Sequence, residues 1–304
     1  MEGLLYPRLK EADVILGYHN VVADNGRRFN LRSIRRSDFR RQLIYFKRNY
    51  QVVSLEEMLT RKNPGIKRLA ITFDDGLQNN FTHAAVILRR LRIPATFFVC
   101  LGASGEDILW TDRLAIILHH VSTPFQYDGE EYSKTASGAF ANSDGQRIEH
   151  VLKSSDAIVR KAFCKMLVSQ LGFDPVSNAH PDHWKLLSEE QIRALHTHAL
   201  FDIGSHGLAH ELFTRLSDPE LEQELNQSKQ RLEEITQSTI TTLSFPDGNY
   251  DKRVIAKAAE VGYKHLIGVI TPPTETCVHS RTGVYHDRSW IEQLHALQSK
   301  VLNQ

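Results

Sequence analysis

The chain has 304 residues, of which 41% are hydrophobic and 24% charged, a composition ordinary for a globular protein with one large core or two modest ones. Its formal net charge of +1, with neutral histidines, argues against the global basic field of proteins that bind nucleic acid or anionic membranes. Three widely spaced cysteines without a CxxC pair argue against a disulfide framework and against a cysteine-rich zinc site.

Short apolar runs alternate with amphipathic stretches over the first hundred residues. A buried strand is expected at 13–18, followed by a helix at 37–50 whose apolar residues form one stripe. Ser54 and Glu57 form a capping-box pattern that opens a short helix at 55–61. The other elements expected here are a strand at 68–73, a helix at 79–91 and a strand at 95–100. This alternation is typical of a parallel α/β fold.

The alternation loses clarity between about 102 and 184. Helical patterns at 112–120 and 155–171 flank a polar stretch at 128–145 that contains glycine and serine. We interpret residues 103–185 as an insertion that could cover the mouth of the core fold and select a smaller substrate. Residues 1–304 are therefore expected to form a single domain with this insertion.

Regular alternation resumes after residue 184. The expected helices are 188–199, 218–236 and 251–260, the last ended by a C-cap glycine at 262, and the expected strands are 201–204, 239–245 and 263–270. Six or seven β–α units favour an α/β fold closed into a distorted (β/α) barrel. A doubly wound open sheet is the alternative, because periodicity alone does not decide closure.

Three polar clusters follow predicted strands directly: TFDDG at 72–76, SHGLAH at 205–210 and SFPDG at 244–248. Each motif alone has an ordinary structural explanation as a turn or as surface histidines. In a parallel barrel, however, the strand C-termini open on one face, where active sites are built. We therefore expect the three clusters to converge at one site.

The residue types in these clusters favour metal-assisted hydrolysis. Adjacent Asp74 and Asp75 would raise one another's pKa, and a cation removes the conflict by binding one carboxylate and leaving the other free as a base. His206 and His210, four residues apart, can reach the same ion. One carboxylate and two imidazoles make a three-ligand zinc-type site with an open position for water.

These segments resemble the polysaccharide deacetylase family, whose shared region is called the NodB-homology domain. Residues 71–76 match its first motif, 203–206 with His210 its second, and 243–248 a degenerate form of its third. The segments GYHNVV at 17–22, PATFFV at 94–99 and GY at 262–263 extend the likeness. It covers most of the chain except about 103–185 and the last dozen residues.

The resemblance implies a distorted, seven-stranded (β/α) barrel that removes acetyl groups from amino sugars with a divalent metal, commonly Zn²⁺, with Co²⁺, Mn²⁺ or Ni²⁺ as alternatives. Carried over, Asp74 is the general base and Asp75, His206 and His210 are the metal ligands. Pro246 and Asp247 are expected at the substrate, where the family uses a backbone N–H to hold the oxyanion, and His19 is a further substrate-binding candidate.

The chain departs from the family pattern at several positions. Gly207 stands where the family has Ser or Thr, and Asp247 where Tyr or Phe is common. The family's late general-acid histidine motif is not found intact. His286, beside Asp287, is the first candidate for that acid, with His19 second and His265 third.

The expected function is metal-dependent removal of an acetyl group, N-acetyl rather than O-acetyl, from a carbohydrate or glycan precursor. A hydrolase of non-sugar amides on the same scaffold and an inactive carbohydrate-binding relative are the alternatives. The joint presence of Asp74, Asp75, His206 and His210 argues against the last. The expected partner is an acetylated sugar or glycan, not nucleic acid. Because no signal-peptide pattern and no apolar window of roughly 18 residues occurs, we expect a cytoplasmic protein without an integral membrane segment.

Overall fold

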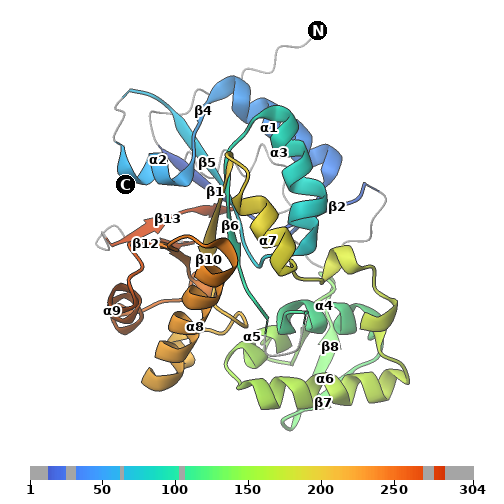
Figure 1. Ribbon diagram of the computed structural model, residues 1–304. Coiled ribbons are helices and arrows are strands. Elements are labelled where there is room, and N and C mark those ends of the chain that lie inside the picture. The colour runs from blue at the N-terminus through green and yellow to red at the C-terminus, as the bar shows by residue number, and fades with distance from the viewer. Residues whose placement is uncertain (1–12, 25–31, 62–64, 103–106, 270–276, 285–304) are drawn as a thin grey trace.

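The computed structural model describes residues 13–24, 32–61, 65–102, 107–269 and 277–284 (Figure 1). A parallel sheet wrapped by helices forms the larger part, and an inserted lobe between residues 107 and 186 lies beside it, drawn in green at the lower right. Among the described helices, none is both long and apolar enough to cross a membrane.

The main sheet nearly closes into a barrel. Its strands follow the order β13–β12–β11–β10–β6–β5–β1–β14, and every neighbouring pair is parallel. The path comprises β1 (Val14–Tyr18), β5 (Arg68–Phe73), β6 (Ala95–Val99), β10 (Phe201–Ser205), β11 (Thr242–Ser244), β12 (His265–Gly268), β13 (Val278–Ser280) and β14 (Thr282–Gly283). Outside it, β4 (Gln51–Val52) pairs with β5, and β2 (Asn20–Val22) pairs with β3 (Ser33–Arg35).

The two ends of this path are consecutive in the chain. β13 pairs with β12 and β14 pairs with β1, and only Arg281 separates β13 from β14. One segment therefore joins both edges of the sheet, as closure requires. The expected barrel is confirmed, but the expected count of seven strands is wrong. Eight strands lie on the path because the last segment is divided at Arg281.

Local sequence signals explain where the barrel's helices begin and end. Ser54 accepts a hydrogen bond from the Glu57 N–H at the start of α2 (Leu55–Thr60), and Ser188 forms a capping box at the start of α7 (Glu189–His196). Gly262 ends α9 (Lys252–Val261) in the left-handed region. The expected helix at 79–91 instead begins with a π-helical turn, η1 (Asn80–Ala84). The helices are α1 (Arg36–Asn49), α2 (Leu55–Thr60), α3 (Ala85–Leu91), α7 (Glu189–His196), α8 (Asp218–Thr236) and α9 (Lys252–Val261).

Alternate strand residues build the two faces of the barrel wall. Tyr18, Phe73 and Phe97 stack along the outer face, where Phe39 of α1 packs against them. Between them along the strands, Ile15, Ala70 and Phe98 belong to a separate apolar cluster. A Cβ at Gly204 would lie 2.6 Å from the Phe98 ring, so this glycine makes room for the ring. Tight packing of this kind fixes the positions of the strand ends.

The insertion has an apolar core of its own, formed by residues such as Phe125, Phe140 and Phe163. Its elements are α4 (Trp110–His120), β7 (Phe125–Tyr127), β8 (Glu130–Lys134), β9 (Phe140–Ala141), α5 (Ile148–Lys153) and α6 (Ala157–Leu171). The antiparallel sheet β7–β8–β9 overlaps the polar stretch at 128–145, for which no strand was predicted. In β8 only Tyr132 is buried, so the strand shows no apolar alternation.

Candidate active site

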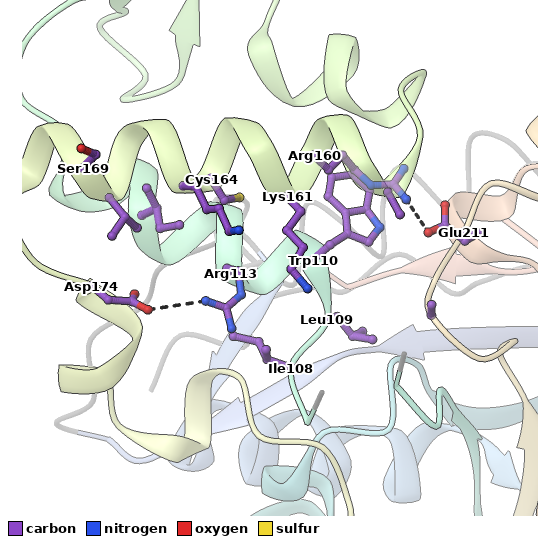
Figure 2. Close-up of a pocket in the computed structure, with 15 residues that line it drawn as sticks. Ile108, Leu109, Trp110, Arg113, Arg160, Lys161, Cys164, Ser169, Asp174 and Glu211 are labelled. Carbon is purple, nitrogen blue, oxygen red and sulfur yellow. Dashed lines mark hydrogen bonds and ion pairs between the residues drawn. The ribbon is translucent and has the colours of Figure 1, made fainter. Parts of the chain in front are cut away.

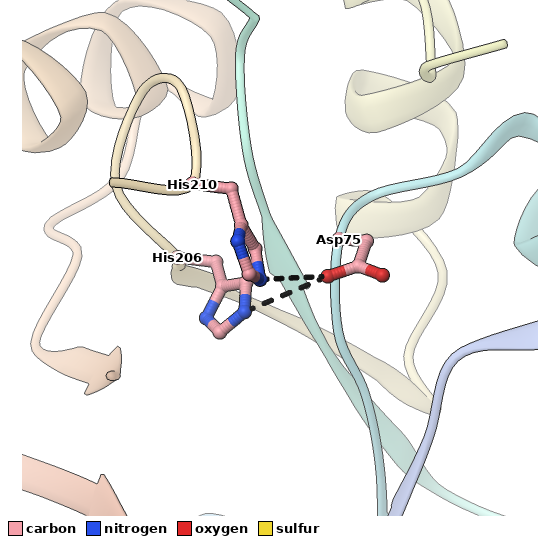
Figure 3. A group of neighbouring side chains, drawn as sticks. All are labelled: Asp75, His206 and His210. Atoms are coloured by element: carbon pink, nitrogen blue, oxygen red, sulfur yellow. Dashed lines mark ion pairs between the residues drawn. The ribbon is translucent and has the colours of Figure 1, made fainter. Parts of the chain in front are cut away.

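The three polar clusters come together at the C-terminal ends of β5, β10 and β11. Asp75 Oδ1 lies 3.7 Å from His206 Nε2 and 3.5 Å from His210 Nε2 (Figure 3). The three side chains are buried, with at most 1% of any of them exposed. One potential ligand atom from each lies within 4.8 Å of the other two. The convergence expected from the sequence is therefore present.

The loop that carries both histidines depends on an unusual backbone. Gly207 has φ +79°, and a Cβ there would lie 2.9 Å from Glu224 Oε1. Glu224 of α8 accepts hydrogen bonds from the backbone N–H groups of Leu208 (2.6 Å) and Ala209 (3.2 Å). Glycine at 207 thus replaces the hydroxyl residue of the family motif, and Glu224 braces the loop.

The donor set fits a zinc-type cation. Tetrahedral ligands at the usual 2.0–2.1 Å from Zn²⁺ are about 3.3 Å apart, close to the two distances from Asp75. His206 Nδ1 donates to the Ser244 carbonyl at 2.8 Å, which turns Nε2 toward Asp75 and matches the outer contacts of metal-bound histidines. Neither carboxylate oxygen of Asp75 accepts a hydrogen bond from the described residues, so both are open to a cation.

Asp74 is held by a residue that the sequence reasoning missed. Arg281, at the junction of β13 and β14, donates from Nη1 to Asp74 Oδ1 at 2.7 Å and from Nη2 to Oδ2. The same guanidinium also donates to Ser244 Oγ (2.7 Å) and Thr72 Oγ1 (3.1 Å). No motif marks Arg281, because it reaches Asp74 only when the last strand segment closes the barrel.

This pairing decides the ionisation of Asp74. Burial pushes the pKa of its carboxyl upward, but the Arg281 charge, followed by those of His206 and His19, outweighs burial and holds the pKa far below its usual range. Burial likewise opposes ionisation of Asp75, and Arg32, whose Nη1 lies 3.8 Å from Oδ2, lowers the pKa of that carboxyl. Both carboxylates are therefore charged at neutral pH.

The candidates for a general acid are placed differently. His19 Nε2 lies 3.8 Å from Asp74 Oδ2, and burial lowers the pKa of His19 to about 4. His265 is the first residue of β12, at the end of the barrel opposite Asp74. His286 lies outside the described residues. Of the three, His19 alone is brought to the site by the described part of the chain.

Pro246 and Asp247 lie in the 3₁₀ turn η5 (Pro246–Gly248), which follows β11. Asp247 has φ +55°, a left-handed conformation that is rare for a residue with a side chain. Its Oδ2 pairs with Lys153 Nζ of the insertion at 2.8 Å. Although burial acts upward, His210 and then Lys153 lower the pKa of Asp247 to about 2. The unexpected carboxylate thus ties the third cluster to the insertion.

The first turn of α4 adds another buried carboxyl near the site. Trp110 Nε1 donates to the His210 carbonyl at 3.2 Å. Asp112, two residues later, is 1% exposed, and neither of its carboxylate oxygens has a hydrogen-bond partner among the described residues. Burial, followed by the charge of Asp75, raises the pKa of Asp112 to about 8, against the opposing effect of Arg32. No motif in the sequence marks Asp112, which lies in the insertion.

Comparisons with known proteins agree with the resemblance seen in the motifs. The polysaccharide deacetylase family model matches residues 61–122 and 142–266, more than half of the chain. The protein YxkH of Bacillus subtilis (strain 168) is 22% identical over 264 residues, which are 85% of this chain and 64% of that protein. The chain therefore spans less than two thirds of that relative's length.

Solved structures share the fold. BC0361, a polysaccharide deacetylase from Bacillus cereus, matches with a TM-score of 0.57 and 18% identity over 94% of this chain and 68% of its own. IcaB from Ammonifex degensii matches with a TM-score of 0.58 and 16% identity over 95% of this chain and 98% of its own. At this identity, the likeness supports the barrel architecture.

Proposed function

The chain belongs to the polysaccharide deacetylase family, and from that membership we propose that it is a metal-dependent hydrolase that removes N-acetyl groups from a carbohydrate or glycan precursor. The observation that carries the proposal is the buried cluster of Asp75, His206 and His210, with the ionised Asp74 beside it. We further propose that residues 1–304 act as one catalytic domain, with the insertion at its mouth.

The proposed roles follow from the donor geometry. Asp75, His206 and His210 would hold a divalent cation, with Zn²⁺ favoured by two nitrogen ligands and one oxygen ligand. A bound ion of this kind supplies Lewis acidity at the reacting carbonyl. It would also supply a ligand contact to the buried Asp75 oxygens, which accept no hydrogen bond from the described residues.

Asp74 is proposed as the general base. It would accept the proton of the attacking water while that water's oxygen forms a bond to the acetyl carbon. The C–N bond then breaks, acetate leaves, and a proton passes to the amine. The bidentate contact from Arg281 fixes the Asp74 carboxylate and keeps it ionised. We propose that Arg281 is a positioning residue for the base.

The rest of the site is proposed from position. The backbone N–H of Asp247, held by the left-handed turn, would donate to the oxyanion next to Pro246. His19 is proposed to bind the substrate, because its low pKa keeps it neutral above about pH 4. His286 remains the proposed proton donor to the leaving amine.

An acetate-release screen tests the proposal. Protein stripped with chelator and reloaded with Zn²⁺ or Co²⁺ would be incubated with acetylated monosaccharides, oligosaccharides, nucleotide sugars and lipid-linked sugars, and with non-sugar amides as the comparison. We expect acetate release from at least one sugar class, loss of it on chelation and recovery with metal. Release from non-sugar amides alone would instead support the alternative function, and turnover without metal would contradict the proposed mechanism.

A further inference from the structure

A cavity lies beside the loop that carries His210, whose neighbours Ala209 and Glu211 line it. This pocket, of about 530 Å³, is formed by α4, α6 and the 209–211 segment (Figure 2). Its volume falls within the roughly 300–1,000 Å³ typical of small-molecule sites. Ile108, Leu109, Ile117 and Val168 are among its apolar lining residues. None of its lining residues belongs to the Asp75, His206 and His210 cluster. We call it the α4–α6 pocket.

Polar contacts fix the walls of the α4–α6 pocket. Arg160, only 4% exposed, stacks its guanidinium 4.5 Å from the centre of the Trp110 ring and pairs with Glu211. On the other side, Arg113 lies 3.6 Å from Asp174 (Figure 2). Because these side chains are held by one another, the cavity is formed before any ligand arrives, which lowers the entropic cost of binding.

The open side of the pocket combines basic and apolar groups. Lys161 and Lys165, one helical turn apart on α6, line it with exposed side chains. Lys165 makes no ion pair with any residue that the structure describes. Ile158 is 81% exposed and Phe173 45% exposed, and each is the chain neighbour of a lining residue.

We propose that the α4–α6 pocket binds an amphipathic anion, an alkyl chain that ends in a phosphate or carboxylate. The alkyl chain of the ligand would occupy the apolar interior, and its anionic head group would lie at the open side near Lys165 and Lys161. An alkyl chain fits because much of the lining is apolar. An anion fits because four cationic side chains line the pocket against two carboxylates, Asp174 and Glu211, each of which is already paired with an arginine. The inference goes beyond deacetylation, since neither the metal cluster nor Asp74 takes part in the binding.

The pocket also contacts the machinery proposed above. Ala209 and Glu211 line it on either side of His210, and Trp110 donates to the His210 carbonyl. A ligand in the pocket would therefore touch the loop that presents a metal ligand. The anion could be the lipid end of a glycan substrate or a separate lipid, and the two sources share the same recognition chemistry.

Calorimetric titration tests the proposal without any assay of activity. Octyl phosphate, kept below its micelle concentration, is expected to bind with one site per chain. Hexyl phosphate is expected to bind more weakly, by at most about fourfold for each methylene lost. Inorganic phosphate alone and octyl glucoside are expected to bind at least several-fold more weakly than octyl phosphate. If octyl glucoside binds as tightly as octyl phosphate, the ligand need not be an anion and that part of the proposal is wrong. If inorganic phosphate binds as tightly as octyl phosphate, the alkyl chain contributes nothing and that part of the proposal is wrong.

Matched variants locate the site. Ser169 lines the pocket, whereas its exposed neighbour Gln170 does not. Ser169→Trp is expected to abolish octyl phosphate binding and Gln170→Trp to leave it unchanged. Lys165→Gln is expected to weaken binding roughly threefold, with Lys252→Gln on α9 as the control. Unchanged binding in Ser169→Trp would refute the proposal.

A competition experiment identifies the source of the anion. If a lipid-linked acetylated sugar displaces octyl phosphate, the pocket is assigned to the lipid end of the substrate. Simultaneous binding of the two assigns it to a separate lipid, and either result supports the site. Because these readouts are binding constants, failure here and failure of the deacetylase proposal are distinguishable.

Discussion

Replacing Arg281 by glutamine removes the positive charge that holds Asp74 ionised. Arginine beside an aspartate lowers its pKa by about 1–3 units, and burial alone acts in the opposite direction. The acid limb of the pH–activity profile reports the protonation of the base, because a protonated Asp74 accepts no proton from water. We therefore expect this limb to move to higher pH by about 1–3 units in Arg281→Gln.

The variant is also expected to be less stable at neutral pH. A carboxyl whose folded pKa is depressed stabilises the fold above its unfolded pKa near 3.8, and this stability is lost as pH falls through the folded pKa. Removing one partner of a buried ion pair costs about 3–5 kcal/mol, and a bound cation next to Asp74 would reduce that cost. The loss is expected to be largest in the metal-free protein.

The assay is hydrolysis of p-nitrophenyl acetate by zinc-loaded protein from pH 8 down to the lowest pH at which the protein stays folded and metal-loaded, with metal content measured at each pH. Metal loss at low pH would otherwise imitate protonation of the base. Arg68→Gln is the matched control, because Arg68 is 2% exposed and pairs with Asp13 away from the site. It should lower the melting temperature without moving the acid limb. If the acid limb of the pH–activity profile stays at the wild-type pH in folded, metal-loaded Arg281→Gln, the reasoning is refuted.

Three further outcomes are expected. Asp74→Asn should retain metal but lose at least about a hundredfold in turnover, whereas His206→Ala should lose both, and equal metal loss in the two would contradict the assigned roles. Gly207→Ala should cost about 1–2 kcal/mol of unfolding free energy and weaken metal binding, while Gly138→Ala, with φ +86° and open space around it, should leave metal binding unchanged. The pKa of Asp112 is raised to about 8, so the native state keeps a proton that the unfolded state releases. Stability of the metal-free protein should therefore fall as pH rises from about 4 to 8, by at most about 1.4 kcal/mol per pH unit, and urea titrations of Asp112→Asn should show a shallower fall.

The sequence predicted those parts of the site that are local in the chain. Asp74 and Asp75 follow a continuous apolar run, and the His206 and His210 pair follows another, so strand and motif were visible together. The register of parallel strands then brings them to one edge. The family resemblance added the division of roles between Asp74 and the three proposed ligands.

Residues that act through long-range closure left no such signal. Arg281 is an ordinary arginine in the sequence, and its contact with Asp74 spans 207 positions. Asp112 lies on a helix that was expected, but nothing in the helical pattern shows which carboxyl is buried without a partner. Glu224 is one of several acidic residues on α8, and its contacts with the 208–209 backbone depend on how α8 packs.

Arg281 and the altered third motif lie on different strand segments of the barrel. The family usually offers an arginine or an aromatic residue around the proline, and this chain has Phe245 and Asp247 there. Inside a narrow barrel a long guanidinium can reach the same carboxylate from more than one strand, and here it comes from the strand that closes the barrel. In the third cluster, the Asp247 side chain pairs with Lys153 of the insertion. The segment that closes the barrel therefore also carries the residue that keeps Asp74 ionised, while Asp247 joins the insertion to the third cluster.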